Sequence, residues 1–321
     1  MTARVTCALT LALVAAMLLS LIAGKVWVPP AILGSDDPRA LIIMELRLPR
    51  TLLAALVGAA LGMSGAAMQG YLRNPLADPG LFGVSSGAAL GAVISLFFGY
   101  GAQAWLLPTF ALTGAAAAMA LLALLIGRSG SLIVFTLGGV ILSSIAGSMT
   151  ALAISLAPTP FATSQIVTWL MGALTDRSWD DVTIALPLIA IGIALLAATA
   201  RSLDVLTLGE PAARSMGVDP LRLQLLIIGG VGLCVGASVA AAGIIGFVGL
   251  IVPHLVRPFV GHRPSAVLLP SAIAGALLLV VADSVVRAAP TVSELRLGIA
   301  MSMLGGPFFL VLLLRMRRQL P

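Results

Sequence analysis

The charged side chains that could take part in recognition or chemistry are few, and several of them are arginines. Asp283 and Arg287 are four residues apart, so on a helix the two side chains would lie on one face. Such a pair can simply stabilise a helix, but an ionisable residue inside a membrane marks a functional site by default. We leave both interpretations open for Asp283. We favour a functional one for Arg287, which we place on the same side as Arg47 and Arg50.

Motifs for enzyme chemistry are absent from the sequence. It contains no GxxxxGK[ST] loop, so the chain cannot bind ATP through a P-loop. HExxH and Cys/His clusters are also missing, and Cys7 and Cys234 each lie within an apolar run, which argues against a metal site or a disulfide. A proton-driven carrier usually has several acidic or histidine residues at mid-depth, whereas the expected spans contain Asp283 alone. We therefore expect no catalytic residue, no metal and no cofactor on this chain, and an energy source on another polypeptide.

The composition is that of an integral membrane protein. Of the 321 residues, 60% are hydrophobic and 9% charged, against about a quarter charged in soluble domains, and the mean hydropathy is +1.13. The net charge of +6 comes from basic residues that are scattered between apolar runs and form no stripe, which excludes a nucleic-acid partner. The basic residues are therefore expected to set the topology.

Uncharged stretches long enough for a membrane helix predict ten spans. The first is interpreted as a retained helix in preference to a signal peptide, because the run is long and its end is a poor cleavage site. The expected spans are residues 4–25, 51–72, two within 79–127 separated at Gly99-Tyr100-Gly101, one up to Ala157, 182–200, two within 223–256 separated near Ala242-Gly243, 264–286 and 297–314. A short helix that does not span is expected around Ser164–Gly172.

These spans predict an all-α polytopic membrane protein of ten transmembrane helices, with residues 1–321 as one transmembrane domain. Glycines at four-residue spacing, such as Gly58 and Gly62, predict close packing between helices. With ten spans both termini share a side. That side then holds eleven of the arginines and lysines and the other side holds seven, so the termini are predicted to be cytoplasmic.

The segment Leu203–Arg222, between spans six and seven, differs from the rest because it is short and charged. Its charged residues are Asp204, Glu210, Arg214, Asp219 and Arg222. Pro211 suits the first turn of a helix and Gly217 suits a left-handed cap after the last turn, so we expect one short helix of about two turns. A capped helix is not needed merely to return the chain from one membrane span to the next. We interpret it as a docking element for a soluble partner.

Three stretches carry a resemblance to a known family. They are Leu208–Val218, Arg47-Leu48-Pro49-Arg50 with the later Asn74–Gly80, and Gly246–His254. In their order along the chain they resemble the permease subunits of bacterial ABC importers for iron-siderophores, haem and vitamin B12, of the FecCD type. The resemblance covers nearly the whole chain.

The resemblance implies a homodimer in the bacterial inner membrane, two ATP-binding subunits on the cytoplasmic side and a periplasmic substrate-binding protein. ATP and magnesium would then belong to the partner ATPase. The residues implied for coupling to the ATPase are Gly209, Glu210, Ala212, Ala213, Arg214, Met216 and Gly217, with Ala212 and Ala213 expected to press into a cleft on that subunit. The arginines implied for docking the binding protein are Arg47, Arg50 and Arg287.

Further residues are implied for a cytoplasmic gate. Asn74, Pro75 and Leu76 match one gate element, although asparagine and proline are also common in ordinary turns. Ser131, Leu132 and Ile133 match the other element and are less polar than in the vitamin B12 permease. Arg296 departs from the family pattern, which has proline there, and its part in the docking patch stays open.

The sequence does not choose among an iron-siderophore, haem and a corrinoid as cargo, and we lean to an iron chelate or haem. The alternative from another class is a self-sufficient secondary transporter or channel. The docking helix and the lack of acids in the spans argue against it.

Overall fold

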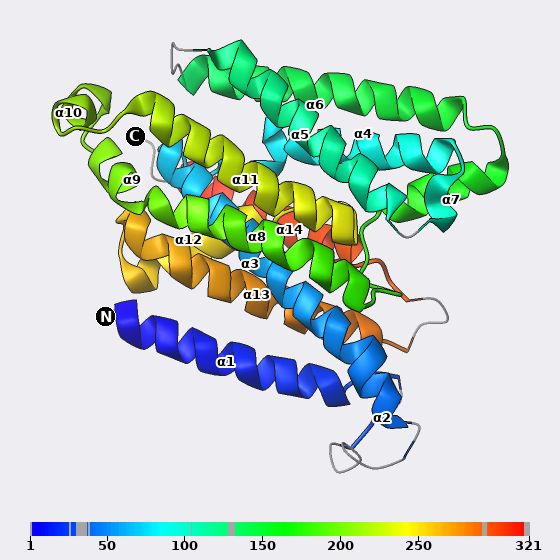
Figure 1. The fold of residues 1–321 in the computed structure, drawn as a ribbon. Coiled ribbons are helices and arrows are strands. Elements are labelled where there is room, and N and C mark those ends of the chain that lie inside the picture. Colours follow the sequence, from blue (N-terminus) through cyan, green and yellow to red (C-terminus); the bar gives the residue numbers. More distant parts are fainter. Residues whose placement is uncertain are drawn as a thin grey trace.

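A computed structural model describes residues 2–25, 27–29, 37, 39–103, 105–127, 132–290 and 294–317. In this part of the chain all regular structure is helical (Figure 1). The long helices are α1 (Thr2–Ile22), α3 (Leu48–Tyr71), α5 (Leu106–Ile126), α6 (Leu132–Ser155), α8 (Trp179–Ala198), α11 (Pro220–Ala242), α13 (Pro264–Ala288) and α14 (Leu297–Arg317). The shorter ones are α2 (Arg39–Leu41), α4 (Val84–Phe97), α7 (Pro160–Leu170), α9 (Ala200–Leu206), α10 (Glu210–Ser215) and α12 (Val248–Val260).

Eight described helices are long and apolar enough to cross a membrane, and α4 and α12 are shorter apolar helices. The ten spans predicted from the sequence thus correspond to eight full-length candidates and two short ones. Both predicted breaks are present, since Gly99 and Gly243 adopt left-handed backbone conformations with φ of +78° and +70°. The predicted short helix is α7, which begins four residues earlier than Ser164.

Glycines bring the central helices into direct backbone contact. A Cβ added to Gly58 of α3 would collide with the carbonyl of Gly275 in α13, and a Cβ on Gly275 would collide with that of Gly58. Gly62 meets the backbone of Ser271 in the same way. The close approach predicted from the spacing of Gly58 and Gly62 is therefore confirmed, and it joins α3 and α13 into one tightly packed pair.

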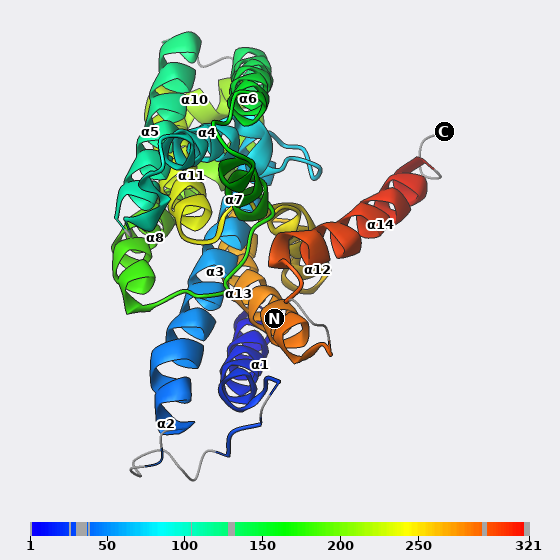
Figure 2. The ribbon, with the colours of Figure 1, turned by 90° about the vertical axis from the view of Figure 1, so that its right-hand side faces the viewer.

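The helices run roughly lengthwise between two ends of the molecule. Helix α3 lies at the centre, with α13 and α1 on one side and α8 and α11 on the other, while α4, α5 and α6 form the outer layer (Figure 1). Helix α14 extends away from the bundle over most of its length (Figure 2). We call the end that carries α9, α10 and the N-terminus the α10 end. The opposite end, with α2, α7 and the start of α14, is the α2 end.

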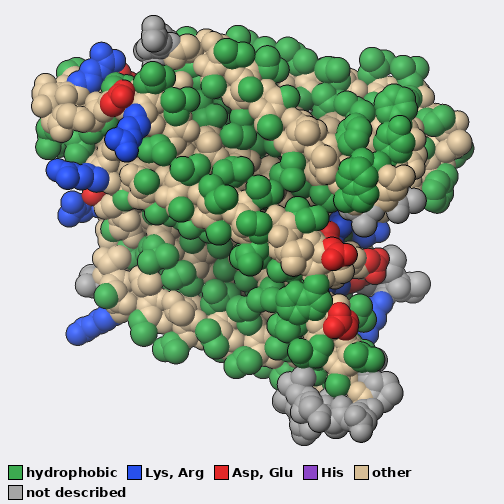
Figure 3. Space-filling view, viewed as in Figure 1, with side chains coloured by type: hydrophobic (Ala, Val, Ile, Leu, Met, Phe, Trp, Pro, Cys, Tyr) green, Lys and Arg blue, Asp and Glu red, His purple; other side chains and the backbone are tan. Residues whose placement is uncertain are grey.

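Charged side chains lie at these two ends, with apolar surface between them (Figure 3). At the α10 end the basic residues include Arg4, Arg73, Arg201, Arg214, Arg222 and Arg263. The α2 end carries most of the acidic residues, among them Asp37, Glu45, Asp176, Asp180, Asp181 and Glu294. The band between the ends has the length and composition of a membrane-embedded surface.

Candidate functional site

At the α10 end the chain makes a compact corner in which each turn has a local cause. Helix α9 ends at Leu206, and Gly209, with φ of +99°, turns the chain into α10. Pro211 lies in the first turn of α10, where its missing N–H costs nothing, and the Glu210 carboxylate is favourable beside the positive end of the helix. The expected short helix is α10, and Thr207–Gly209 separates it from α9.

The far end of α10 is closed by a left-handed glycine. Gly217 has φ of +82°; its N–H donates to the carbonyl of Arg214, and the N–H of Val218 donates to that of Ala213, both at 3.0 Å. This is the pattern of a Schellman cap. The cap predicted at Gly217 is confirmed, and it gives α10 a fixed end although the helix has only six residues.

The inner face of α10 packs against its own chain. Ala213 is 2% exposed and lies in an apolar seat with Tyr71, Leu206, Val218 and Leu223. The expectation that Ala213 presses into a cleft on another protein is therefore wrong, because its methyl group already fills this seat. Ala212, beside it, is half-buried and does reach the surface.

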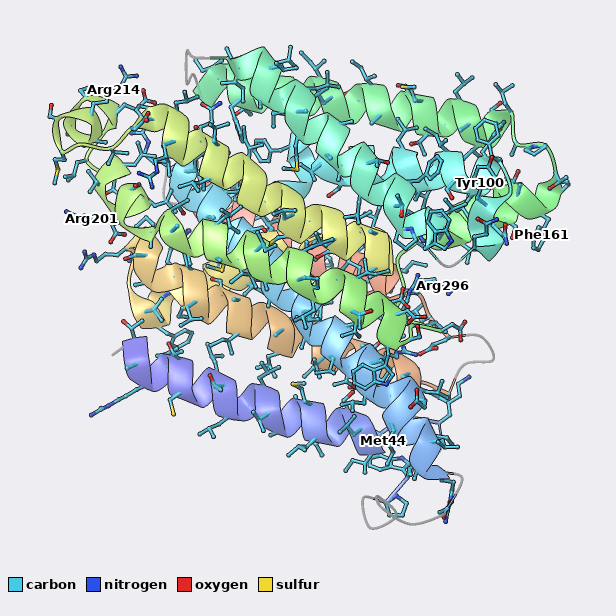
Figure 4. All side chains as sticks on the ribbon, in the orientation of Figure 1. Met44, Tyr100, Phe161, Arg201, Arg214 and Arg296 are labelled. Carbon is cyan, nitrogen blue, oxygen red and sulfur yellow. The ribbon has the colours of Figure 1, made fainter. Side chains whose placement is uncertain are left out.

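The outer face of α10 is apolar and accessible. Leu208 is 65% exposed and Met216 is 60% exposed, one before and one after the helix. Between them Pro211, Arg214 and Ser215 are also exposed, and Figure 4 shows Arg214 at the tip of the corner. Two large apolar side chains flanking a rigid, capped helix form a surface that another protein could cover. We call Leu208, Pro211, Ala212, Ser215 and Met216 the α10 face.

Asp204 ties the corner to α13. Its carboxylate accepts hydrogen bonds from the backbone N–H of Ser265 at 2.9 Å and from the hydroxyl of Ser265 at 2.6 Å. Arg263 adds an ion pair at 3.3 Å. The carboxylate thus satisfies a donor at the N-terminus of α13, as a capping side chain does. The clamp thus joins α9 to a helix of 25 residues that reaches the α2 end.

The corner after α3 at the same end holds the residues expected in a gate. The Asn74 side chain accepts from the N–H of Leu76 at 2.9 Å, so Asn74, Pro75 and Leu76 form a turn that the asparagine itself stabilises. Beside it a cavity of about 310 Å³ is lined by residues that include Asn74, Pro75, Thr207 and His262. The role of this turn as a gate stays a prediction. Of the other gate element, Ser131 lies outside the described residues, and α6 begins at Leu132.

A buried polar link lies next to this corner. The side chain of Gln69 in α3 donates to the carbonyls of Gly249 and Leu250 in α12 at 3.3 and 3.4 Å, and it accepts from Arg257 at 2.8 Å. Because Gln69 is 2% exposed, these partners are needed to offset the cost of burying its amide. Helices α3 and α12 are thereby held together at the α10 end.

At the α2 end an arginine and two carboxylates form a buried cluster. Arg50 of α3 donates to both oxygens of Asp283 in α13, at 2.7 to 3.0 Å, and also to Glu294. Asp283 is fully buried. Burial raises the pKa of the Glu294 carboxyl, but hydrogen bonding and attraction from Arg50 hold that pKa below its ordinary value. We call Arg50, Asp283 and Glu294 the α2-end cluster.

The arginines expected to form an open docking patch are all buried in this structure. Arg47, Arg50 and Arg287 are 7%, 8% and 8% exposed. Arg47 donates to the carbonyls of Leu21 and Ile22, and Arg287 donates to Ser20. Of the two interpretations left open for Asp283, the ion pair with Arg287 does not form among the described residues, because Asp283 pairs with Arg50 from another helix. A docking role for the three arginines stays a prediction.

Sequence analysis missed three residues that the structure makes important. The sequence analysis named Asp204 only as one of the charged residues of its segment, and it named neither Gln69 nor Glu294. Within the described residues no group of three or more His, Cys, Asp or Glu side chains could hold a metal ion.

Comparison with known proteins places this geometry in context. The model of the FecCD transport family matches residues 12–315. The chain is 42% identical over 293 residues to the uncharacterized ABC transporter permease YvrB of Bacillus subtilis, which covers 89% of this chain and 82% of YvrB. It is 38% identical over 311 residues to BtuC, the vitamin B12 import system permease of Klebsiella pneumoniae, which covers 96% of this chain and 93% of BtuC. A solved structure assigned to a metal-chelate type ABC transporter, in an inward-facing conformation, matches with a TM-score of 0.89 at 32% identity, over 97% of this chain and 99% of that one.

Proposed function

The chain is a permease subunit of the FecCD transport family and not itself an enzyme, and we propose that it imports a metal chelate using energy from separate ATP-binding subunits. The relatives include a vitamin B12 permease and a metal-chelate type transporter, so the proposed cargo is an iron-siderophore, haem or a corrinoid. Family membership sets aside the alternative of a self-sufficient secondary transporter. ATP and magnesium are proposed to bind to the partner ATPase.

The proposed topology has ten spans, with both termini and α10 on the cytoplasmic side of a bacterial inner membrane. Helices α4 and α12, of 14 and 13 residues, would cross together with the non-helical segments that adjoin them. Basic residues are concentrated at the α10 end and acidic ones at the α2 end, which supports this orientation by the positive-inside rule.

A second copy of this chain and membrane lipid are proposed to cover the apolar flanks. Helix α14 extends away from the bundle, and Met303, at 70% exposure, and Leu310, at 58%, leave large apolar surface on it (Figure 2). A homodimer in which α14 contacts the other copy would bury part of this surface. Lipid would cover the remainder.

The α10 face is proposed as the contact with the ATPase subunits. The observation that carries this proposal is the combination of a capped helix, exposed apolar side chains at Leu208 and Met216, and a carboxylate clamp from Asp204 to α13. A rigid element can transmit a push, whereas a solvated loop would absorb it. The substrate-binding protein is proposed to dock at the α2 end, where Arg47, Arg50 and Arg287 support the surface that it meets.

Reconstitution tests this function. The permease is placed in liposomes with its ATP-binding subunits and its binding protein, and uptake of an iron chelate and of vitamin B12 is measured with and without ATP. We expect uptake of one of these cargoes only when all partners and ATP are present. The permease alone should hydrolyse no ATP, because it has no P-loop. Uptake by the permease alone, driven by an ion gradient, would contradict the proposal.

A further inference from the structure

A cavity of about 390 Å³ opens at the α2 end, next to the α2-end cluster, since its lining residue Thr175 donates to Glu294. It lies between the start of α5, helix α7, the segment that leads to α8 and the residue just before α14. The polar side chains that line it include Gln103, Gln165, Trp169, Thr175, Arg177 and Arg296. Its volume falls in the range of about 300–1,000 Å³ that is typical of small-molecule sites.

Two hydrogen-bond donors in this cavity have no partner among the described residues. They are the indole N–H of Trp169 and the Nε–H of Arg177, and both nitrogen atoms are buried. Buried donors are normally satisfied, so each unsatisfied one requires an explanation. Both groups can only donate, so the missing partner must be an acceptor.

The charge of the cavity is also unbalanced. Arg177 makes an ion pair with Asp181 at 3.4 Å, and Asp181 is the one acidic residue among the lining side chains. Arg296 is half-buried and forms no ion pair within the described part of the chain. The nearby Glu294 is already bound to Arg50 and Thr175. Two arginines and one carboxylate leave an excess of one positive charge.

Figure 4 shows Arg296 at the end of the bundle, where α14 begins. We propose that this cavity binds a carboxylate of the cargo, with Arg296 supplying the charge and Trp169 and Arg177 supplying the hydrogen bonds. An arginine fork and single N–H donors match a planar carboxylate, and the excess positive charge favours an anionic group over a neutral one. This inference rests on the proposed transport function and narrows its cargo to chelates with free carboxylates.

The probe for the test is citrate, which carries carboxylates and is small enough for the cavity. The chain has four tryptophans, so replacing Trp27, Trp105 and Trp179 with phenylalanine leaves Trp169 as the only indole reporter. Citrate is titrated into this variant in lipid nanodiscs while the fluorescence of Trp169 is recorded. We expect a saturable change with citrate and none with triethyl citrate, which has the same skeleton without charges.

Arg296→Gln in the same background should weaken citrate binding by at least about tenfold, because a charge-assisted contact is lost. Arg201→Gln, which removes an exposed arginine at the α10 end, is the matched control and should bind as the parent does. Among the described residues Arg296 has no ion-pair partner to lose, so its replacement should leave the thermal unfolding temperature unchanged. Isothermal titration calorimetry of citrate binding to Trp169→Phe then tests the indole donor alone, and we expect this variant to bind citrate more weakly than the parent.

Three results would overturn the proposal: no saturable response, an affinity that Arg296→Gln leaves unchanged, or phosphate binding as tight as citrate binding. The assay needs neither the ATPase nor the binding protein. If citrate does not bind but ATP-dependent uptake is intact, only the proposed carboxylate site is refuted. If citrate binds but no ATP-dependent uptake is found, the proposed transport function is refuted instead.

Discussion

The two ends of this permease are built on opposite principles. At the α10 end the large apolar side chains Leu208 and Met216 are exposed beside the charged residues of the corner. At the α2 end Arg50, Asp283 and Glu294 satisfy one another beneath the surface. One end is prepared for a partner and the other holds itself closed.

A single packed pair of helices connects these ends. Helix α13 begins at the Asp204 clamp and carries Asp283 near its other end, about 25–30 Å further along at about 1.5 Å per residue. Its glycine contacts with α3 leave no space for the two helices to slide independently. If α10 receives the ATPase as proposed, the α3–α13 pair offers a continuous path from the corner to the α2-end cluster.

The largest effect is expected from removing the centre of the α2-end cluster. Arg50→Ala would leave the fully buried Asp283 carboxylate without its partner, which costs about 3–5 kcal/mol when a buried pair is broken. Thermal or denaturant unfolding in detergent measures this loss. Arg39→Ala, which removes an exposed ion pair with Asp37, is the control and should change little. Equal stability of the two variants would show that the cluster does not hold the α2 end closed.

A smaller effect is expected from overpacking the seat of α10. Ala213→Trp would force a large ring into a filled apolar seat, where overpacking typically costs about 1–3 kcal/mol. Ala212→Trp, at the half-buried neighbour, is the matched control for stability. Unfolding measurements should separate the two variants, with Ala213→Trp the less stable. If both variants are equally stable, Ala213 is not packed in the apolar seat as described.

Removal of the clamp between the corner and α13 should lower stability by a small to intermediate amount and should lower ATP-dependent uptake more strongly. Asp204→Ala removes a side chain that caps α13, for which losses of about 0.5–2 kcal/mol are typical. ATP-dependent uptake should fall by more than the fraction of unfolded protein explains. Asp180→Ala, an exposed acid at the α2 end, should leave both quantities unchanged. Normal uptake by Asp204→Ala would mean that force reaches α13 by another route.

The smallest effect is a pH dependence of the α2 end. The pKa of Glu294 is below its ordinary value of 4.5, so the folded state favours the ionised carboxylate. Its contribution to stability is therefore fully present above that ordinary value and is lost as the pH falls through the lowered pKa. The difference in unfolding temperature between the parent and Glu294→Gln should be largest near neutral pH and shrink under acid conditions. A difference that grows on acidification would contradict the assignment.

Much of the fold could be predicted from the sequence because membrane helices are determined by length and hydropathy. The two breaks at Gly99 and Gly243 and the cap at Gly217 were predictable because glycine alone adopts those backbone conformations easily. Helix α9, which lies between α8 and α10, was not predicted, since its seven residues are too few for a clear helical pattern.

The partners of buried charges could not be predicted. Asp283 and Arg287 have the spacing of a helical pair, yet Asp283 binds Arg50, which lies 233 residues away along the chain. Only the packing of α3 on α13 brings those side chains together. The same is true of Ala213, whose exposure depends on Tyr71 and Leu223 from two other helices.

The central claim, that the α10 face receives the ATPase, is tested most directly by capture of the ATP-binding subunits on immobilised permease. Met216→Asp places a charge within the proposed contact, and Met44→Asp changes an exposed methionine at the α2 end in the same way (Figure 4). The account predicts that Met216→Asp lowers capture by at least about tenfold and abolishes uptake, as expected for an apolar interface anchor. Its stability should stay within about 0.5 kcal/mol of the parent, and Met44→Asp should capture the ATPase normally. Undiminished capture by Met216→Asp, together with normal transport, would contradict the account.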